Sequence, residues 1–205
     1  MFGAHERAVA ELYRGLFLDL DVLVERLASA AAPARILEVG CGEGQMTTRL
    51  AQTFPRAEIL GVDISPRVGR LCSAPAPGVR FRCATLAQLV AEGPAPFDLI
   101  TLCDVLHHVP PAERMALLAA VRQLCAPGGC FVLKDWERRQ TPIHWACALS
   151  DRLITGDRVH YCSRAELREL LERAFPESSI EELAPTPPWL HNRAWCVRAS
   201  RERHG

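Results

Sequence analysis

The stretch ILEVGCGEG, residues 36–44, places three glycines within five positions directly after a run of β-forming residues. Glycine weakens regular structure because it loses more backbone entropy on folding than any other residue. Three glycines with this entropic cost, placed between a strand and a helix, have two possible explanations. Either the backbone makes a turn that side chains would obstruct, or a ligand lies against it. The N-terminus of a following helix would favour a carboxylate or phosphate group.

Short apolar runs alternate with segments of helical periodicity on both sides of these glycines. The pattern predicts strands at residues 35–39, 58–62, 79–83, 97–103 and 130–134, and helices at 44–54, 85–91 and 111–125. Pro127 and its neighbouring glycines predict a tight turn at 126–129, before the fifth strand. This alternation is typical of an α/β fold with a parallel sheet covered on both faces. Ligands in such sheets bind beyond the carboxyl ends of the strands.

The two ends of the chain depart from this alternation. Apolar spacing predicts an opening helix over about 9–20, and Asp21 is a candidate cap for a second helix that runs to about Leu27. Ser163 and Glu166 have the spacing of a capping box, for a helix that ends near Phe175. Residues 178–183 and 193–200 can then pair as a hairpin. We expect one domain over 1–205: N-terminal helices (1–33), a cofactor-binding core (35–135), a substrate lid (136–162), and a C-terminal helix with hairpin (163–200).

Composition limits the kinds of partner. The 205 residues carry 24 basic and 24 acidic side chains, and this balance argues against a surface for nucleic acid or an anionic membrane. No apolar run reaches membrane-spanning length, and the start lacks a basic-then-apolar signal segment. Nine cysteines without a CxxC pair are typical of buried thiols in a reducing compartment. We therefore expect a soluble, cytoplasmic protein.

A carboxylate about twenty residues beyond the glycines indicates what kind of ligand they bind. Asp63 ends the second predicted strand, where an acid can accept both hydroxyls of a ribose. A P-loop would need Lys and Ser or Thr where Gln45 and Met46 stand, and the dinucleotide pattern GxGxxG is here GxGxG, led by Glu38. The combination predicts a cofactor that contains adenosine.

Four segments, LEVGCGEG, GVDIS, FDLITLCDVLHHV and LCAPGGCFVLKD, together resemble the class I S-adenosylmethionine-dependent methyltransferases, over roughly residues 35–135. The resemblance implies a Rossmann-like three-layer sandwich with a seven-stranded, mostly parallel sheet whose last strand is antiparallel. It also implies S-adenosylmethionine as the cofactor and S-adenosylhomocysteine as the product.

The resemblance assigns cofactor contacts residue by residue. The glycine loop would pass beneath the cofactor with Gly40, Cys41, Gly42 and Gly44. At the methionine end of the cofactor, Glu38 would orient the group and Cys103 would offer its backbone. Asp63 would hold the ribose, and Ile64 would pack on the adenine. Cys83 and Ala84 stand where such enzymes often carry an Asp-Ala pair that meets the adenine amino group, and a thiol is a poor acceptor. For Cys41, a buried small residue is favoured over a redox switch because no basic partner is evident.

Methyl transfer is an in-line displacement, and an acceptor that carries a proton needs a base. We expect that base at His144, with His108 and Asp151 as further candidates and His160 and His191 behind them. The adjacent His107 is assigned to packing at the strand end, a role that His108 can also have.

Aromatic residues in and near the lid can form flat apolar walls around an acceptor. The predicted substrate-binding residues are Trp136, His160, Tyr161, Trp189 and His191, with Trp145 beside them. These aromatic side chains can equally anchor the lid on the sheet. Asp104 and Asp135 end adjacent strands, but two carboxylates leave Mg²⁺ short of oxygen ligands, so we expect no metal.

These features predict a methyltransferase for a small acceptor, with no nucleic-acid or membrane partner. An aromatic or polyketide-like acceptor, methylated on oxygen or carbon, is favoured because residues 134–159 are similar to the tails of methyltransferases of bacterial secondary metabolism. A catalytically silent methyltransferase-like subunit is the main alternative, and the glycine spacing disfavours a nicotinamide-dependent oxidoreductase. Whether the acceptor is carrier-bound, and the oligomeric state, stay open.

Overall fold

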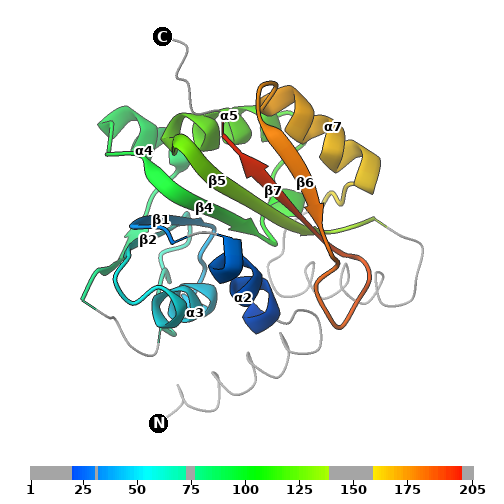
Figure 1. Cartoon of the computed structure of the whole chain (residues 1–205). Coiled ribbons are helices and arrows are strands. Elements are labelled where there is room, and N and C mark those ends of the chain that lie inside the picture. The colour runs from blue at the N-terminus through cyan, green and yellow to red at the C-terminus, as the bar shows by residue number, and fades with distance from the viewer. Residues whose placement is uncertain (1–19, 31, 73–76, 139–158, 200–205) are drawn as a thin grey trace.

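One seven-stranded sheet runs through the computed structural model, which describes residues 20–30, 32–72, 77–138 and 159–199 (Figure 1). The strands are β1 (Arg35–Val39), β2 (Glu58–Asp63), β3 (Val79–Cys83), β4 (Phe97–Cys103), β5 (Cys125–Trp136), β6 (Ser179–Leu183) and β7 (Asn192–Arg198). Their order is β3-β2-β1-β4-β5-β7-β6. The first five strands pair in parallel, and β7 lies antiparallel between β5 and β6. The predicted sheet, with its C-terminal hairpin, is confirmed.

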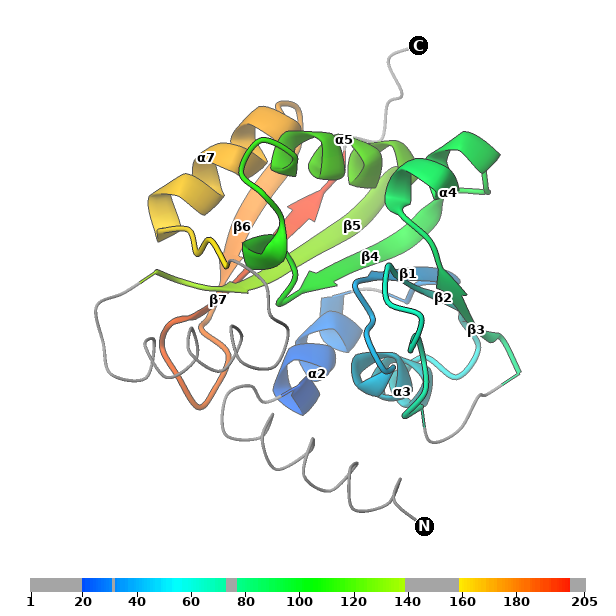
Figure 2. The ribbon, with the colours of Figure 1, turned by 180° about the vertical axis from the view of Figure 1, so that it is seen from behind.

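Helices cover both faces of the sheet (Figures 1 and 2). The described helices are α2 (Leu20–Ala30), α3 (Gln45–Thr53), α4 (Leu86–Glu92), α5 (Arg114–Leu124) and α7 (Arg164–Ala174), with a short 3₁₀ helix, η1, at Leu106–His108. Neighbouring strand residues point to opposite faces. Ile36 belongs to the core beneath α2 and α3, whereas Leu37 belongs to the core beneath α4, α5 and α7. This alternation produces the three layers.

The predicted capping box is present at the start of α7. The Ser163 side chain accepts a hydrogen bond from the Glu166 amide, and the Glu166 carboxylate accepts one from the Ser163 amide. Thr85 and Gln88 form the same arrangement at the start of α4. Each box satisfies amide groups that have no partner within their own helix.

Two predicted boundaries are wrong. Residues 126–129 do not form a turn before the fifth strand but a bulge inside β5, because Phe97 pairs with Cys125 and Leu99 pairs with Cys130. Gly128 has a φ of 73°, a conformation that side chains disfavour. At the other end of the chain, α2 continues to Ala30, and Asp21 lies in its first turn, where it pairs with Arg49 at 2.8 Å.

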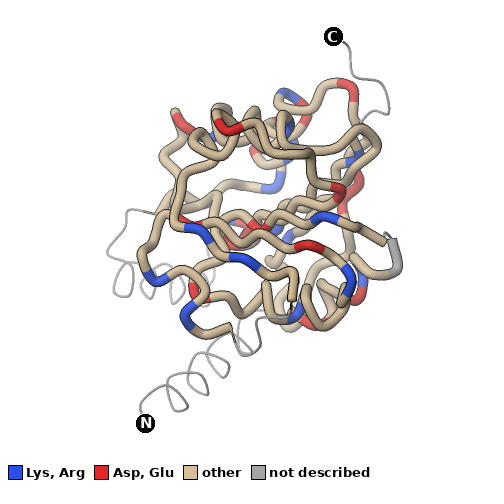
Figure 3. The backbone as a smooth tube through the Cα atoms, turned by 90° about the vertical axis from the view of Figure 1, so that its left-hand side faces the viewer, with Lys and Arg blue, Asp and Glu red and all other residues tan. Residues whose placement is uncertain are grey.

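Acidic and basic residues are interspersed along the backbone in Figure 3, in keeping with a formal net charge of zero. Among the described helices, none combines the length and the apolar character needed to cross a membrane. The opening helix expected over 9–20 lies outside the described residues, apart from Leu20, which begins α2. Residues 139–158 of the expected lid also lie outside them.

Candidate active site

The three glycines after β1 all have positive φ angles, 69° at Gly40, 51° at Gly42 and 92° at Gly44. Residues other than glycine rarely adopt this conformation. A Cβ atom at Gly40 would lie 2.2 Å from Cγ2 of Val105, and one at Gly44 would lie 3.0 Å from Cζ of Phe81. At Gly42 a Cβ atom would meet nothing within 4 Å. Two glycines are therefore required by packing inside the protein, and the middle one borders open space that a ligand can use.

Asp63 is held against this loop by main-chain donors. Its carboxylate accepts one hydrogen bond from the Gly42 amide and one from the Ser65 amide, each at 2.8 Å. Each carboxylate oxygen keeps a further lone pair, so the group can still accept ribose hydroxyls. The next side chain, Ile64, is apolar yet 78% exposed. An exposed apolar side chain beside a fixed carboxylate suits a ligand with a ribose and a flat apolar ring.

Glu38 is buried in β1, where Oγ1 of Thr47 donates a hydrogen bond to its Oε2 at 2.5 Å. Thr47 is a residue that sequence reasoning missed. A threonine in the first turns of a helix has no distinctive spacing, and only the fold brings it to the strand. A buried carboxylate in this position can orient a cationic ammonium group.

The residues assigned to the adenine contact have other partners. The exposed Cys83 thiol donates to the Ile64 carbonyl at 3.5 Å, and the Ala84 amide donates to the Asp63 carbonyl at 2.9 Å. The adenine contact of Cys83 and Ala84 thus stays a prediction. Burial raises the pKa of the Cys41 and Cys103 thiols, with acidic neighbours adding to the effect. Both thiols are neutral at pH 7, which agrees with the interpretation of Cys41 as a buried side chain.

Four ionisable residues meet at the carboxyl ends of β4 and β5. Asp104 follows β4 with a φ of 56°, which is unusual outside glycine. Its two oxygens lie 2.6 and 2.8 Å from Nζ of the fully buried Lys134. Ligand atoms of Asp104, His107 and Asp135 lie within 4.8 Å of one another. Asp104 and Asp135 are the two carboxylates weighed above as metal ligands. In the structure, Asp104 pairs with Lys134 and Asp135 pairs with His107.

His107 and Asp135 form a buried pair. Nδ1 of His107 lies 2.5 Å from Oδ1 of Asp135, and the His107 amide donates to Oδ2 at 3.0 Å. The Trp136 amide also donates to Asp135, at 2.8 Å. Burial opposes ionisation of Asp135, but His107, Lys134 and the Trp136 amide together hold the pKa of this carboxyl below its usual range. The ionised carboxylate therefore fixes the His107 ring and directs Nε2 away from itself.

The sequence ranked His108 above His107, but the carboxylate partner belongs to His107. His108 is half-buried at the end of η1, and its ring centroid lies 4.2 Å from that of His107. The pairing was hidden because Asp135 lies 28 positions further along the chain. His144 and Asp151, the other predicted catalytic residues, lie outside the described residues, as does Trp145.

The five predicted substrate-binding residues gather beside this pair. Trp136 and Tyr161 are buried in an aromatic cluster with the half-buried Trp189. The Tyr161 ring stacks on His107 at 4.8 Å. The remaining two make main-chain contacts: the His160 amide donates to the His107 carbonyl at 2.7 Å, and the His191 carbonyl accepts from the Glu137 amide at 2.9 Å. The cluster packs beside His107, so its aromatic side chains anchor this region, and their contact with an acceptor stays a prediction.

Strand order and site together define a class of protein. The order of the sheet reverses between β1 and β4, and the glycine loop and η1 follow those two strands. Ligands bind at this reversal in open α/β sheets. A family model described as a methyltransferase domain matches residues 12–174. The chain belongs to this family, the class I S-adenosylmethionine-dependent methyltransferases with a Rossmann-like fold, and its cofactor is S-adenosylmethionine.

Particular relatives are similar over parts of the chain. Trans-aconitate 2-methyltransferase of Methylobacterium nodulans is 37% identical over 114 residues, which are 56% of this chain and 43% of that protein. Ubiquinone biosynthesis O-methyltransferase of Xanthomonas campestris is 34% identical over 151 residues, 69% of this chain and 60% of that protein. This chain therefore spans about half the length of these relatives.

A solved structure confirms the fold at low sequence identity. Magnesium protoporphyrin IX methyltransferase from Synechocystis, with bound S-adenosylhomocysteine, superposes with a TM-score of 0.66. It is 23% identical, and the match covers 88% of this chain and 81% of that one.

Proposed function

We propose that this chain transfers the methyl group of S-adenosylmethionine to a small organic acceptor, with His107 as the proton acceptor. The observation that carries the proposal is the His107–Asp135 pair at the carboxyl edge, next to a glycine loop and a carboxylate that suit the cofactor. When bound, S-adenosylmethionine supplies an activated methyl group.

The cofactor-binding residues fit this role. Asp63, held by two main-chain amides, would accept the ribose hydroxyls, and the open space at Gly42 would admit the ligand close to the backbone. Glu38 would face the methionine end, and the exposed Ile64 would lie against the adenine. Cys41 contributes only backbone, because its side chain is buried.

His107 would act on the acceptor through Nε2. In the neutral ring, an Nδ1–H that donates its hydrogen bond to Asp135 places the lone pair on Nε2, which is the tautomer that a base requires. When Nε2 takes a proton from an acceptor hydroxyl or acidic carbon, His107 becomes an imidazolium. The ionised carboxylate of Asp135 is then its counter-ion. His144 and Asp151 stay as alternative bases within residues 139–158.

We infer a small, flat acceptor, aromatic or polyketide-like, methylated on oxygen or carbon. The aromatic cluster of Trp136, Tyr161 and Trp189 supports an apolar acceptor. Two relatives, a trans-aconitate 2-methyltransferase and a ubiquinone biosynthesis O-methyltransferase, have names that also support a small acceptor. A role in bacterial secondary metabolism and a location in the cytoplasm stay proposals.

Mass spectrometry after incubation with S-adenosylmethionine and a panel of phenols, enols and carboxylic acids tests the function. We expect a product heavier by one methyl substitution, and turnover in His107→Gln reduced by roughly a hundredfold or more, with nearly unchanged cofactor affinity. His108→Gln is the matched control. Normal turnover in His107→Gln would transfer the role to His144 or Asp151. Cofactor binding without turnover on any acceptor would favour the silent subunit.

A further inference from the structure

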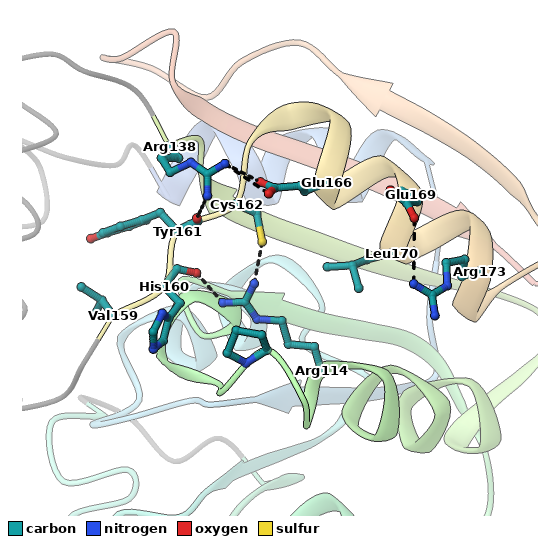
Figure 4. A pocket seen from close by; sticks show the side chains of 11 residues that line it. Arg114, Arg138, Val159, His160, Tyr161, Cys162, Glu166, Glu169, Leu170 and Arg173 are labelled. Atoms are coloured by element: carbon teal, nitrogen blue, oxygen red, sulfur yellow. Dashed lines mark hydrogen bonds and ion pairs between the residues drawn. The ribbon is translucent and has the colours of Figure 1, made fainter.

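A cavity of about 510 Å³ lies between the start of α5 and α7, on the side of the His160–Cys162 segment that faces those helices (Figure 4). Tyr161 lines this cavity and also stacks on His107, so the segment forms a wall between the cavity and the proposed catalytic pair. The volume lies within the range of small-molecule sites. The cofactor-binding residues do not line it, and the predicted substrate-binding residues that border it, His160 and Tyr161, belong to this wall.

Arg114 is the most unusual residue of this cavity. It is only 5% exposed, and it donates to two main-chain carbonyls, of Val109 and His160. It also donates to Sγ of Cys162 at 2.6 Å. Among the described residues, no carboxylate lies within ion-pair distance of Arg114. Burial raises the pKa of the Cys162 thiol despite the nearby guanidinium, so this sulfur is not an anionic partner at pH 7.

A buried cation without a counter-ion is costly, because the protein interior does not replace the hydration that the charge loses. Within the part of the chain that the structure describes, Arg114 has two carbonyls and a thiol as acceptors, and these neutral groups satisfy N–H donors without compensating the charge. The guanidinium has five N–H donors, and these three acceptors leave further donors for an incoming ligand. An anion in the cavity would supply the missing charge.

Two more arginines line the cavity, and each forms an ion pair with a glutamate at an exposed position. Arg173 lies 3.9 Å from Glu169, with both side chains more than half exposed. Arg138 pairs with Glu166 at 3.0 Å, again at an exposed position. Exposed ion pairs of this kind contribute little to stability. Among the described residues that line the cavity, three carry guanidinium groups and two carry carboxylates (Figure 4).

The rest of the wall is partly apolar. Leu170, Val159 and Pro111 line the cavity. An anion with an apolar body would place its charge near the guanidinium groups and its body against these side chains.

We propose that this cavity is a binding site for an anion, a carboxylate or a phosphate, with Arg114 as its buried counter-ion and Arg138 and Arg173 as further donors. The site is separate from the cofactor site, and binding does not require methyl transfer.

Calorimetry on the full chain without cofactor tests the site. The probes are inorganic phosphate, acetate and benzoate, each compared with sodium chloride at equal ionic strength. We expect saturable binding of at least one probe. Tightest binding of phosphate would identify a phosphoryl ligand, and tighter binding of benzoate than of acetate would identify an organic carboxylate seated on the apolar wall.

Arginine variants localise the binding. Arg138→Gln and Arg173→Gln should each weaken it by roughly fivefold, and Arg114→Gln by more than about tenfold, because each removes a charge-assisted donor. Arg168→Gln is the matched control, since Arg168 lies on α7 outside the cavity and pairs with Glu172. If Arg114→Gln does not fold, the two exposed variants still decide. No saturable binding of any probe, or equal affinity in Arg138→Gln, Arg173→Gln and Arg168→Gln, would overturn the proposal.

Discussion

The hydrogen bond from the Gly42 amide to Asp63 joins the two positions on which the cofactor site most depends. The left-handed conformation of Gly42 and the carboxylate of Asp63 together fix the shape of the glycine loop, and this shape leaves open space beside Gly42. The two residues can be tested separately, because Asp63 contributes a charge and Gly42 contributes the open space that a ligand needs.

Asp63→Ala should remove most cofactor affinity while the protein stays folded. The lost acceptor for two hydroxyls corresponds to about 2–4 kcal/mol of binding free energy. The variant also frees the Gly42 and Ser65 amides, which water can reach in this half-buried position. Calorimetric titration with S-adenosylmethionine measures the loss. Glu43→Gln, in the same loop but paired with Arg70, is the control. Unchanged affinity in folded Asp63→Ala would refute the ribose assignment.

Gly42→Ala and Gly93→Ala form a matched pair. Their φ angles are 51° and 58°, and at both positions a Cβ atom would meet nothing within 4 Å. Each variant should lower the free energy of unfolding by about 1–2 kcal/mol, the cost of a left-handed conformation with a side chain. Only Gly42→Ala should also weaken S-adenosylmethionine binding, because Gly93 lies at the end of α4. Equal cofactor affinity in the two variants would mean that the loop does not lie against the ligand.

At the scale of elements, the capping box of α7 supports the wall between the cavity and the His107–Asp135 pair. α7 begins directly after the His160–Cys162 segment, so its first turn holds that segment in place. Ser163→Ala should lower the free energy of unfolding by about 1 kcal/mol, measured in urea, because the Glu166 amide loses its acceptor. Thr85→Ala should have a similar effect at α4, whereas Ser179→Ala, exposed at the start of β6, should have little. A stability of Ser163→Ala equal to that of Ser179→Ala would contradict this role.

The sequence predicted the elements best where a strand is buried on both faces. β1 and β4 begin and end where their apolar runs do, because a parallel strand covered by helices is apolar over most of its length. The bulge in β5 was missed, since Pro and Gly occur in bulges as well as in tight turns. The His107–Asp135 pair was missed as well. It depends on which strands lie side by side and in what register, and local periodicity does not contain this information.

At the scale of the whole molecule, acid should weaken the fold through Asp135. Its pKa is lowered in the folded state, so the ionised carboxylate stabilises the fold above its unfolded pKa of about 4. This contribution is lost as the pH falls through the lower, folded pKa. The free energy of unfolding of Asp135→Asn should therefore lie below that of the wild type at pH 7 and approach it below about pH 4. Urea titrations between pH 3 and 7 measure the difference.

The control for this measurement is Asp21→Asn, which removes a charge from an exposed position. Its free energy of unfolding should stay close to that of the wild type over the same range. A constant difference between Asp135→Asn and wild type at every pH would show that the ionised carboxylate contributes nothing to folding.

The position of β7 also affects how the chain is made. β7 is the last described strand to be synthesised, yet it lies between β5 and β6, both of which precede it. Until Asn192–Arg198 leaves the ribosome, residues 130–136 of β5 have no neighbour on that side, and β6 has no strand to join. An unpaired apolar strand edge on a nascent chain invites pairing with other chains. Polypeptides arrested before Asn192 should therefore depend on chaperones, and release of β7 should end that dependence.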